Sequence, residues 1–109
     1  MPRAEHQPLY YCHGFNSGIP DDISTSPKIQ VVSDFCRATG REFRPQNVDY
    51  RFADRHAREI LDSVSPDVKN VLFCGASMGG WFSRILQLLL AGERPALRVE
   101  AVIFNPAFN

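Results

Sequence analysis

The chain has 109 residues, enough for one domain, and 44% of them are hydrophobic, which is typical of a globular rather than a disordered protein. Its 12 Lys and Arg residues are balanced by 12 Asp and Glu residues, so the formal net charge is zero. This balance gives no indication of a nucleic acid or an anionic membrane as partner. No apolar stretch is long enough to span a bilayer, and the first residues lack the apolar segment of a signal peptide, so we expect a cytoplasmic protein.

The cysteines form no metal-binding or disulfide pattern. There are three of them, an odd number, and Cys12, Cys36 and Cys74 lack the spacing of metal ligands. Cys12 and Cys74 fall within apolar runs, where a free thiol behaves as a small buried hydrophobic group. Residues 75–80, GASMGG, also lack the lysine of a phosphate-binding P-loop. We therefore expect no metal and no cofactor.

The chain alternates between apolar runs, typical of buried strands, and stretches with helical periodicity. Strands are expected over residues 9–12, 41–44, 69–74 and 99–104. Helices are expected from Pro27 to Gly40, with Ser26 as the N-cap, and over residues 53–64 and 78–90. The expected stops for the second strand, the third helix and the fourth strand are Pro45, Ala91-Gly92 and Asn105-Pro106.

Each expected helix has apolar residues on one face. The residues expected to face a sheet are Ile29, Val32, Phe35 and Cys36 in the first helix, Ala57, Ile60, Leu61 and Val64 in the second, and Trp81, Ile85, Leu88 and Leu89 in the third. The order β-α-β-α-β-α-β implies parallel strands joined by right-handed helical crossovers. The predicted fold class is therefore α/β, a three-layer, doubly wound, mostly parallel sheet in one domain over residues 1–109.

Residues 71–80, VLFCGASMGG, join an apolar strand to a helix through the spacing G-x-S-x-G. A serine at the tip of such a tight turn takes a strained backbone conformation and presents its hydroxyl outside the sheet. The flanking Gly75 and Gly79 have to be small, because the strand and helix backbones nearly touch there. The pattern predicts Ser77 as a nucleophile. The alternative is a chance match, with a serine that has only a structural role in the turn.

Four short motifs, in this order, resemble those of a known family. They are YYCHGFNS at 10–17, Ser26-Pro27-Lys28 at a helix start, GASMGG at 75–80 and VIFNPAF at 102–108. Over nearly the whole chain, the sequence is similar to the α/β-hydrolases and, more closely, to the YqiA/YcfP-type esterase-like family (UPF0227). The loop between Ser17 and Lys28 is a few residues longer than in that family's pattern.

The resemblance implies a partial α/β-hydrolase fold and the activity of a carboxylic ester hydrolase. Members of the family continue beyond the strand that ends in Asn-Pro. In α/β-hydrolases the acid and the histidine of the catalytic triad follow the serine, so this chain lacks both of the expected partners. We therefore expect an incomplete domain with weak or no activity of its own.

The resemblance also suggests how an oxyanion would be bound near Ser77. The Met78 backbone N–H, at the start of a helix, is one expected donor. In the H-G-F arrangement the Phe15 backbone N–H is the second donor, and Gly14 lets that backbone approach closely. His13 is expected to organise this loop rather than to act as the base. The alternative is an ordinary turn at the end of a strand.

The sequence does not identify a general base. Apart from His13, the histidines are His6 and His56. His56 is expected in the first turn of the second helix, where it could replace the missing histidine, although a solvated surface side chain is the favoured interpretation. The acids that could orient a base are Asp21, Asp22 and Asp54, and no spacing singles out one of them.

A strand order of 2-1-3-4, as in the α/β-hydrolases, would place the first helix over strands one and two and the other helices on the opposite face. The first face of strands three and four would then be bare, although it is apolar. Strand four would also be an open edge. With this arrangement, two copies of the chain could form a homodimer through the last strand.

These observations favour a serine hydrolase-like protein that acts on small-molecule esters or thioesters of small acyl groups. A first alternative is a non-catalytic interaction module that binds a partner through the open sheet edge. A second alternative is a doubly wound domain that binds an anion such as phosphate through the backbone amides of residues 77–79.

Overall fold

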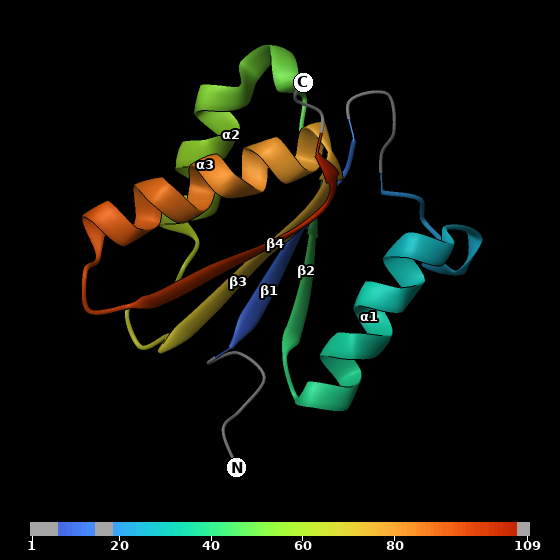
Figure 1. Cartoon of the computed structure of the whole chain (residues 1–109), viewed down its shortest axis with the longest axis horizontal. Coiled ribbons are helices and arrows are strands. Elements are labelled where there is room, and N and C mark those ends of the chain that lie inside the picture. The colour runs from blue at the N-terminus through green and yellow to red at the C-terminus, as the bar shows by residue number, and fades with distance from the viewer. Residues whose placement is uncertain (1–6, 15–18, 107–109) are drawn as a thin grey trace.

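The computed structural model describes residues 7–14 and 19–106, and its centre is a sheet of four parallel strands (Figure 1). The strands are β1 (Pro8–Cys12), β2 (Glu42–Gln46), β3 (Asn70–Ser77) and β4 (Arg98–Pro106). Their order across the sheet is β2-β1-β3-β4, so β2 and β4 form its edges. The predicted α/β class and the expected strand order are both confirmed.

Helices cover the two faces of the sheet. One face packs against α1 (Pro27–Thr39), and the other packs against α2 (Ala53–Asp62) and α3 (Met78–Glu93), as Figure 1 shows. Short 3-10 turns at Ile23–Thr25 and Tyr50–Phe52 precede α1 and α2, and the first of them lies in a stretch expected to be a loop. The layers follow from the topology, because parallel neighbours need a crossover connection between them.

Local sequence explains both ends of α1. Ser26 is the N-cap, and its hydroxyl accepts a hydrogen bond from the Ile29 N–H at 3.4 Å. Pro27 occupies the first helical position, where a missing N–H is tolerated. Gly40 ends the helix with a φ of 70°, and its N–H donates to the Cys36 carbonyl. Caps of this kind are readable from sequence because each depends on a few adjacent residues.

Three of the expected stops are wrong. β2 continues through Pro45, and β4 continues through Pro106. Both strands are edges of the sheet, where the missing N–H of proline need not remove a hydrogen bond between strands. α3 likewise runs past Gly92 to Glu93. Gly92 does not adopt the positive φ with which Gly40 ends α1, so the helix continues through it, and a Cβ at Gly92 would meet nothing within 4 Å.

The core has one layer on each face of the sheet. Successive strand residues point to opposite faces, so Tyr10 and Phe73 pack with α2 and α3, whereas Leu9 packs with α1. The rings of Tyr10 and Phe73 lie 5.5 Å apart at their centroids. The expected inward residues that the structure buries are Ile29, Val32 and Cys36 on α1, and Ala57, Ile60, Leu61 and Val64 on or just after α2.

The inward face of α3 differs from the predicted one. Trp81, Leu88 and Leu89, which were expected to face the sheet, are 42%, 53% and 45% exposed. The residues that α3 buries are Gly79, Gly80, Phe82, Ser83, Leu86 and Leu90. Because α3 is apolar on most of its sides, periodicity could not select the correct face. The small residues in its first turns allow the close approach to the sheet that decides the orientation.

An apolar hollow lies between α1 and the edge strand β4. It is narrower than expected, since α1 also covers β3 and buries Leu72 and Cys74. On β4, Val102 and Phe104 remain 43% and 36% exposed, and Phe35 of α1, expected to be buried, is exposed beside them. We call this hollow the β4 trough. It is lined by Leu9, Val31, Val32, Phe35, Leu72, Cys74, Val102 and Phe104.

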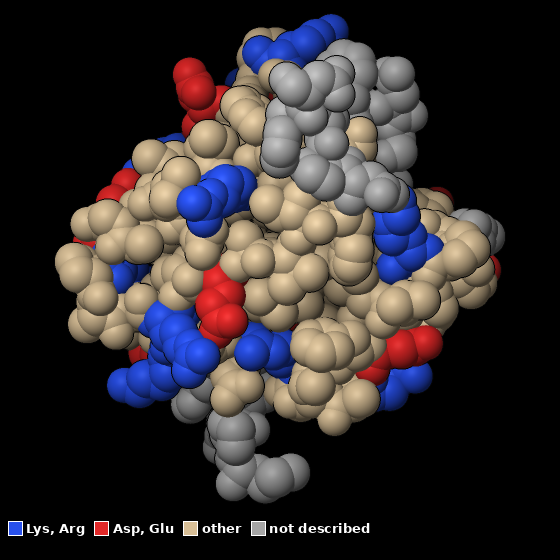
Figure 2. Space-filling model, viewed as in Figure 1, with Lys and Arg blue, Asp and Glu red and all other residues tan. Residues whose placement is uncertain are grey.

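Charges of both signs are spread over the surface. Figure 2 shows one face of the molecule, on which positive and negative side chains are interspersed around a central uncharged area. Many of these charges form ion pairs, such as that of Arg58 with Asp62 and Glu93, both at 2.8 Å. In the part of the chain that the structure describes, no helix has the length and apolar character needed to cross a membrane.

Candidate active site

Ser77 ends β3 in a rarely populated backbone conformation. Its φ is 58° and its ψ is −124°, and it is the one non-glycine residue with a positive φ in the described part of the chain. Such a conformation costs an L-residue on the order of 1–3 kcal/mol. The side chain is exposed, and the hydroxyl makes no capping hydrogen bond to α3. The turn of residues 75–80, which we call the Ser77 turn, therefore presents a serine hydroxyl outside the sheet.

Two glycines allow three backbones to meet at the Ser77 turn. A Cβ at Gly75 would collide with the backbone of Gly79 and would lie 2.8 Å from the Cys12 carbonyl oxygen. A Cβ at Gly79 would collide with the Cys12 carbonyl and would lie 2.5 Å from the His13 carbonyl oxygen. The turn that joins β3 to α3 thus packs directly against the end of β1, and neither glycine position has room for a side chain.

The first turn of α3 is equally close to its neighbours. A Cβ at Gly80 would collide with Cγ2 of Ile103 on β4, a side-chain atom rather than backbone. Ser83 is fully buried, and its hydroxyl donates to the Gly79 carbonyl at 2.7 Å. Close contacts with β1 on one side and with β4 on the other fix the position of Ser77 between them.

Met78 is the first residue of α3 and directly follows Ser77. The N–H groups in the first turn of a helix lack intrahelical acceptors, and they lie at the positive end of the helix dipole. The first turn of α3 has no acidic residue that would compensate this end. The surroundings of Ser77 therefore suit an anionic oxygen. Phe15, the second predicted donor to an oxyanion, lies outside the described residues.

His13 is 5% exposed and ties the end of β1 to the segment after β2. The Val48 N–H donates to His13 Nε2 at 2.9 Å, so the ring proton must be on Nδ1, which donates to the Gly14 carbonyl at 2.6 Å. The Tyr50 hydroxyl donates to the His13 carbonyl at 2.6 Å. Because both ring nitrogens are engaged, this geometry suits a residue that organises the loop and not one that takes a proton from Ser77.

A cavity of about 280 Å³ opens beside Ser77 on the α1 side of the sheet, and we call it the Ser77 cavity. Its lining residues are Tyr11, His13, Gly14, Ser26, Lys28, Ile29, Ala76 and Ser77. Three of them belong to the start of α1, because in a parallel sheet the helices begin at the carboxyl edge of the strands. Nothing local in the sequence links Lys28 to Ser77, so the topology alone reveals that they share a cavity.

The sequence pattern of an uncharacterised protein family, UPF0227, matches residues 8–109. The chain belongs to this family. The match confirms the resemblance to UPF0227 that the four motifs at 10–17, 26–28, 75–80 and 102–108 suggested. No curated protein and no solved structure matches the chain.

In this member of UPF0227, no second histidine of the described chain lines the Ser77 cavity. His56 lies on α2, where its Nδ1 is 3.9 Å from Glu59 Oε2 on the same helix. This contact is typical of a partly solvated helix residue. His6, the remaining histidine, lies outside the described residues.

The acids considered as partners of a base also lie away from the Ser77 cavity. Asp22 caps the 3-10 turn before α1 by accepting a hydrogen bond from the Ser24 N–H at 3.0 Å. Its neighbour Asp21 is exposed and does not line the cavity. Asp54 lies in the first turn of α2 and lines a separate groove, on the other face of the sheet. The structure thus brings none of the three acids to Ser77.

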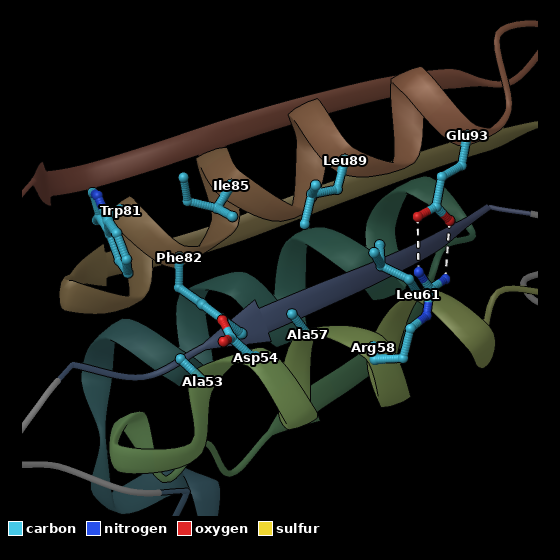
Figure 3. Close-up of a pocket in the computed structure, with 10 residues that line it drawn as sticks. All are labelled: Ala53, Asp54, Ala57, Arg58, Leu61, Trp81, Phe82, Ile85, Leu89 and Glu93. Atoms are coloured by element: carbon cyan, nitrogen blue, oxygen red, sulfur yellow. Dashed lines mark hydrogen bonds and ion pairs between the residues drawn. The ribbon is translucent and has the colours of Figure 1, made fainter.

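That groove runs between α2 and α3 and is shown in Figure 3. Trp81 and Leu89 of α3 form part of its wall. At one end, Arg58 donates two hydrogen bonds to Glu93, at 2.8 and 2.9 Å, and these bonds lower the pKa of the Glu93 carboxyl. The described residues that line the groove include no serine, cysteine or histidine, so they do not supply the groups for nucleophilic catalysis.

Cys12 and Cys74 lie in the strands next to the Ser77 turn, and both are buried. Burial raises the pKa of each thiol to about 12, so both are protonated and unreactive at neutral pH. No group of three His, Cys, Asp or Glu side chains comes together as a metal site among the residues described. The exposed Ser77 hydroxyl is therefore the candidate nucleophile at this edge of the sheet.

Proposed function

We propose that this chain is a serine hydrolase-like protein of the α/β-hydrolase type, in which Ser77 attacks esters or thioesters of small acyl groups. The observation that supports this most is the backbone of Ser77, which holds an exposed serine at a positive φ between a buried strand and a helix N-terminus. A purely structural turn would be better served by glycine, which adopts a positive φ without strain. The absence of room at Gly75 and Gly79 supports the same assignment.

In the proposed reaction, Ser77 Oγ attacks the carbonyl carbon, and its proton passes to a base. An electron pair moves onto the carbonyl oxygen, and the Met78 N–H stabilises the oxyanion, together with the N–H of Phe15. The oxyanion then collapses, the C–O or C–S bond breaks, and the alcohol or thiol leaves with the proton. Water attacks the acyl-serine in the same way, which releases the acid and restores the proton to Ser77.

The proposal assigns the nucleophile and its oxyanion donors. His13 has both ring nitrogens engaged, and His56 does not line the Ser77 cavity. The base and the acid therefore have to come from outside the described residues. Without them, we expect only the residual rate that positioning and the oxyanion donors supply, several orders of magnitude below that of a complete triad.

The test is acylation by p-nitrophenyl acetate, followed by absorbance and by intact mass. We expect slow release of p-nitrophenolate and one acetyl group on Ser77. Ser77→Ala should lose the adduct, whereas Ser65→Ala, at an exposed serine outside the cavity, should retain it. Equal adduct formation in the wild type and in Ser77→Ala would overturn the proposal.

A second candidate function rests on the edge strand β4. In the described part of the chain this strand has a neighbour on one side only, and Val102 and Phe104 on it are exposed. We propose, as the alternative, an interaction module in which two copies pair through β4, an association that the zero net charge does not oppose. Sedimentation equilibrium should then show a dimer that Val102→Lys converts to a monomer. A monomeric wild type at high concentration contradicts this alternative.

A further inference from the structure

The Ser77 cavity contains one charged side chain among the described residues, that of Lys28, and no carboxylate. We propose that Lys28 is a specificity-determining residue, which binds an anionic group, a carboxylate or a phosphate, carried by the substrate next to its reacting carbonyl. The inference rests on the proposed function of Ser77, and it narrows the substrates to anionic esters or thioesters. It concerns binding, and Lys28 takes no part in proton transfer.

The surroundings of Lys28 differ from those of most other cations of the chain. Six arginines form ion pairs with carboxylates, namely Arg37, Arg44, Arg51, Arg55, Arg58 and Arg98. Lys28 is exposed and forms no ion pair with another described residue. A lysine ammonium is a compact charge with three donors on a flexible stem, so it can follow an anionic group that moves within a cavity.

The position of Lys28 is fixed by the packing of α1. Lys28 is the second residue of this helix, and it lies between the N-cap Ser26 and the buried Ile29. The Ser26 hydroxyl accepts the Ile29 N–H, and Ile29 packs in the core with Tyr11 of β1. The backbone of Lys28 is therefore held at the mouth of the Ser77 cavity, while its ammonium group remains free to reach a ligand.

The N-termini of two helices also favour an anionic ligand in the Ser77 cavity. α1 and α3 both begin there, so the positive ends of two helix dipoles lie at one cavity. Neither helix has an acidic residue in its first turn. Proteins commonly place Asp or Glu in the first turn of a helix. Because both helices lack such a residue there, the partial positive charge at their N-termini is available to an anionic ligand. At about 280 Å³, the cavity suits a small acyl group with one anionic substituent.

The experiment uses a thiol in place of the serine, so that reactivity does not depend on a general base. In the Ser77→Cys variant the thiol is exposed, whereas the native cysteines are buried and the pKa of each is raised. We would measure alkylation rates with iodoacetate, which carries a carboxylate, and with neutral iodoacetamide. The ratio of the two rates reports the preference for an anion and cancels differences in the nucleophilicity of the thiol.

We expect this ratio to fall by about three- to tenfold when Lys28→Gln is added to Ser77→Cys, as loss of one unit charge within several ångströms predicts. Lys28→Arg should preserve the ratio, and so should Lys69→Gln, which removes an exposed lysine that does not line the Ser77 cavity. Salt should lower the ratio when Lys28 is present. An unchanged ratio in Lys28→Gln, with circular dichroism showing a folded protein, overturns the inference.

The outcome is separable from that of the proposed function, because the thiol reacts without catalysis by the chain. A Lys28-dependent ratio together with an inert wild-type serine would retain the anion site and contradict the hydrolase. Acylation of wild-type Ser77, together with a ratio that does not depend on Lys28, would support the hydrolase and contradict the anion site. Protection of the thiol by inorganic phosphate but not by succinate would assign the anionic group as a phosphate, and protection by succinate alone would assign it as a carboxylate.

Discussion

The Ser77 turn and the β4 trough are close along β3 and β4, yet they are packed in opposite ways. At the turn, one added carbon atom at Gly79 would collide with the backbone of β1. In the trough, Val102 and Phe104 keep more than a third of their surface in water. Exposed apolar surface forgoes about 25 cal/mol for each Å² that could have been buried. The comparison shows that tight packing in this fold is concentrated where it positions the serine.

Gly79→Ala is the strongest test of the tight packing at the Ser77 turn. The atoms that a new Cβ would meet are backbone carbonyls of Cys12 and His13, which cannot rotate away. We expect the free energy of unfolding, measured by urea denaturation, to fall by more than about 3 kcal/mol. The matched control is Gly92→Ala on the same helix, where the space is open and a gain of about 0.5–1 kcal/mol is expected. Similar values for both variants would show that the turn is not tightly packed.

A smaller loss is expected for Gly80→Ala, because the obstructing atom belongs to the Ile103 side chain and can shift. Overpacking of this kind typically costs about 1–3 kcal/mol. Adding Ile103→Ala should recover part of the loss, which a double-mutant cycle in urea would measure. Strict additivity of the two changes would mean that these residues do not meet.

Ser77→Gly should stabilise the fold by about 1 kcal/mol, because glycine adopts the observed φ of 58° without strain. Ser77→Ala retains a Cβ and should show no such gain. Thermal unfolding of the two variants side by side distinguishes backbone strain from a loss of side-chain contacts. If alanine stabilises as much as glycine, strain at Ser77 is not the cause.

The smallest effect is expected in the β4 trough. Phe104→Ser should change the free energy of unfolding by less than about 0.5 kcal/mol if the trough is as loosely packed as its exposure indicates. Binding of a hydrophobic dye should decrease in the same variant, since the trough loses one of its aromatic walls. A loss of stability comparable to that of Gly80→Ala would remove the contrast between the two regions.

Sequence predicted best those features that depend on adjacent residues. Ser26 and Gly40 mark the ends of α1 through local hydrogen bonds and a positive φ. The spacing of Gly75, Ser77 and Gly79 located the strained turn, because strand, turn and helix follow one another without interruption. The alternation of strands and helices gave the parallel sheet for the same reason, as each crossover is a short local unit.

Features that depend on distant contacts were not predictable in this way. The sequence wrongly predicts that Trp81 and Leu88 face the sheet, because periodicity shows that α3 is apolar but not which side meets the sheet. The sequence wrongly predicts a strand end at Pro45, because the edge position of this strand emerges only when the strands assemble. Lys28 joins Ser77 only through the arrangement of α1 on the sheet, so no spacing in the sequence reveals the pair.

The most direct test of the central claim, that the Ser77 turn presents a nucleophile, is labelling by a fluorophosphonate read by intact mass. The account predicts one adduct on the folded wild type, formed slowly at the residual rate expected without an assigned base and located at Ser77 by peptide mapping. It also predicts no adduct on Ser77→Ala or on the wild type unfolded in urea, because the folded turn creates the reactivity. A folded wild type that stays unmodified, or an adduct that persists in Ser77→Ala, would contradict the account.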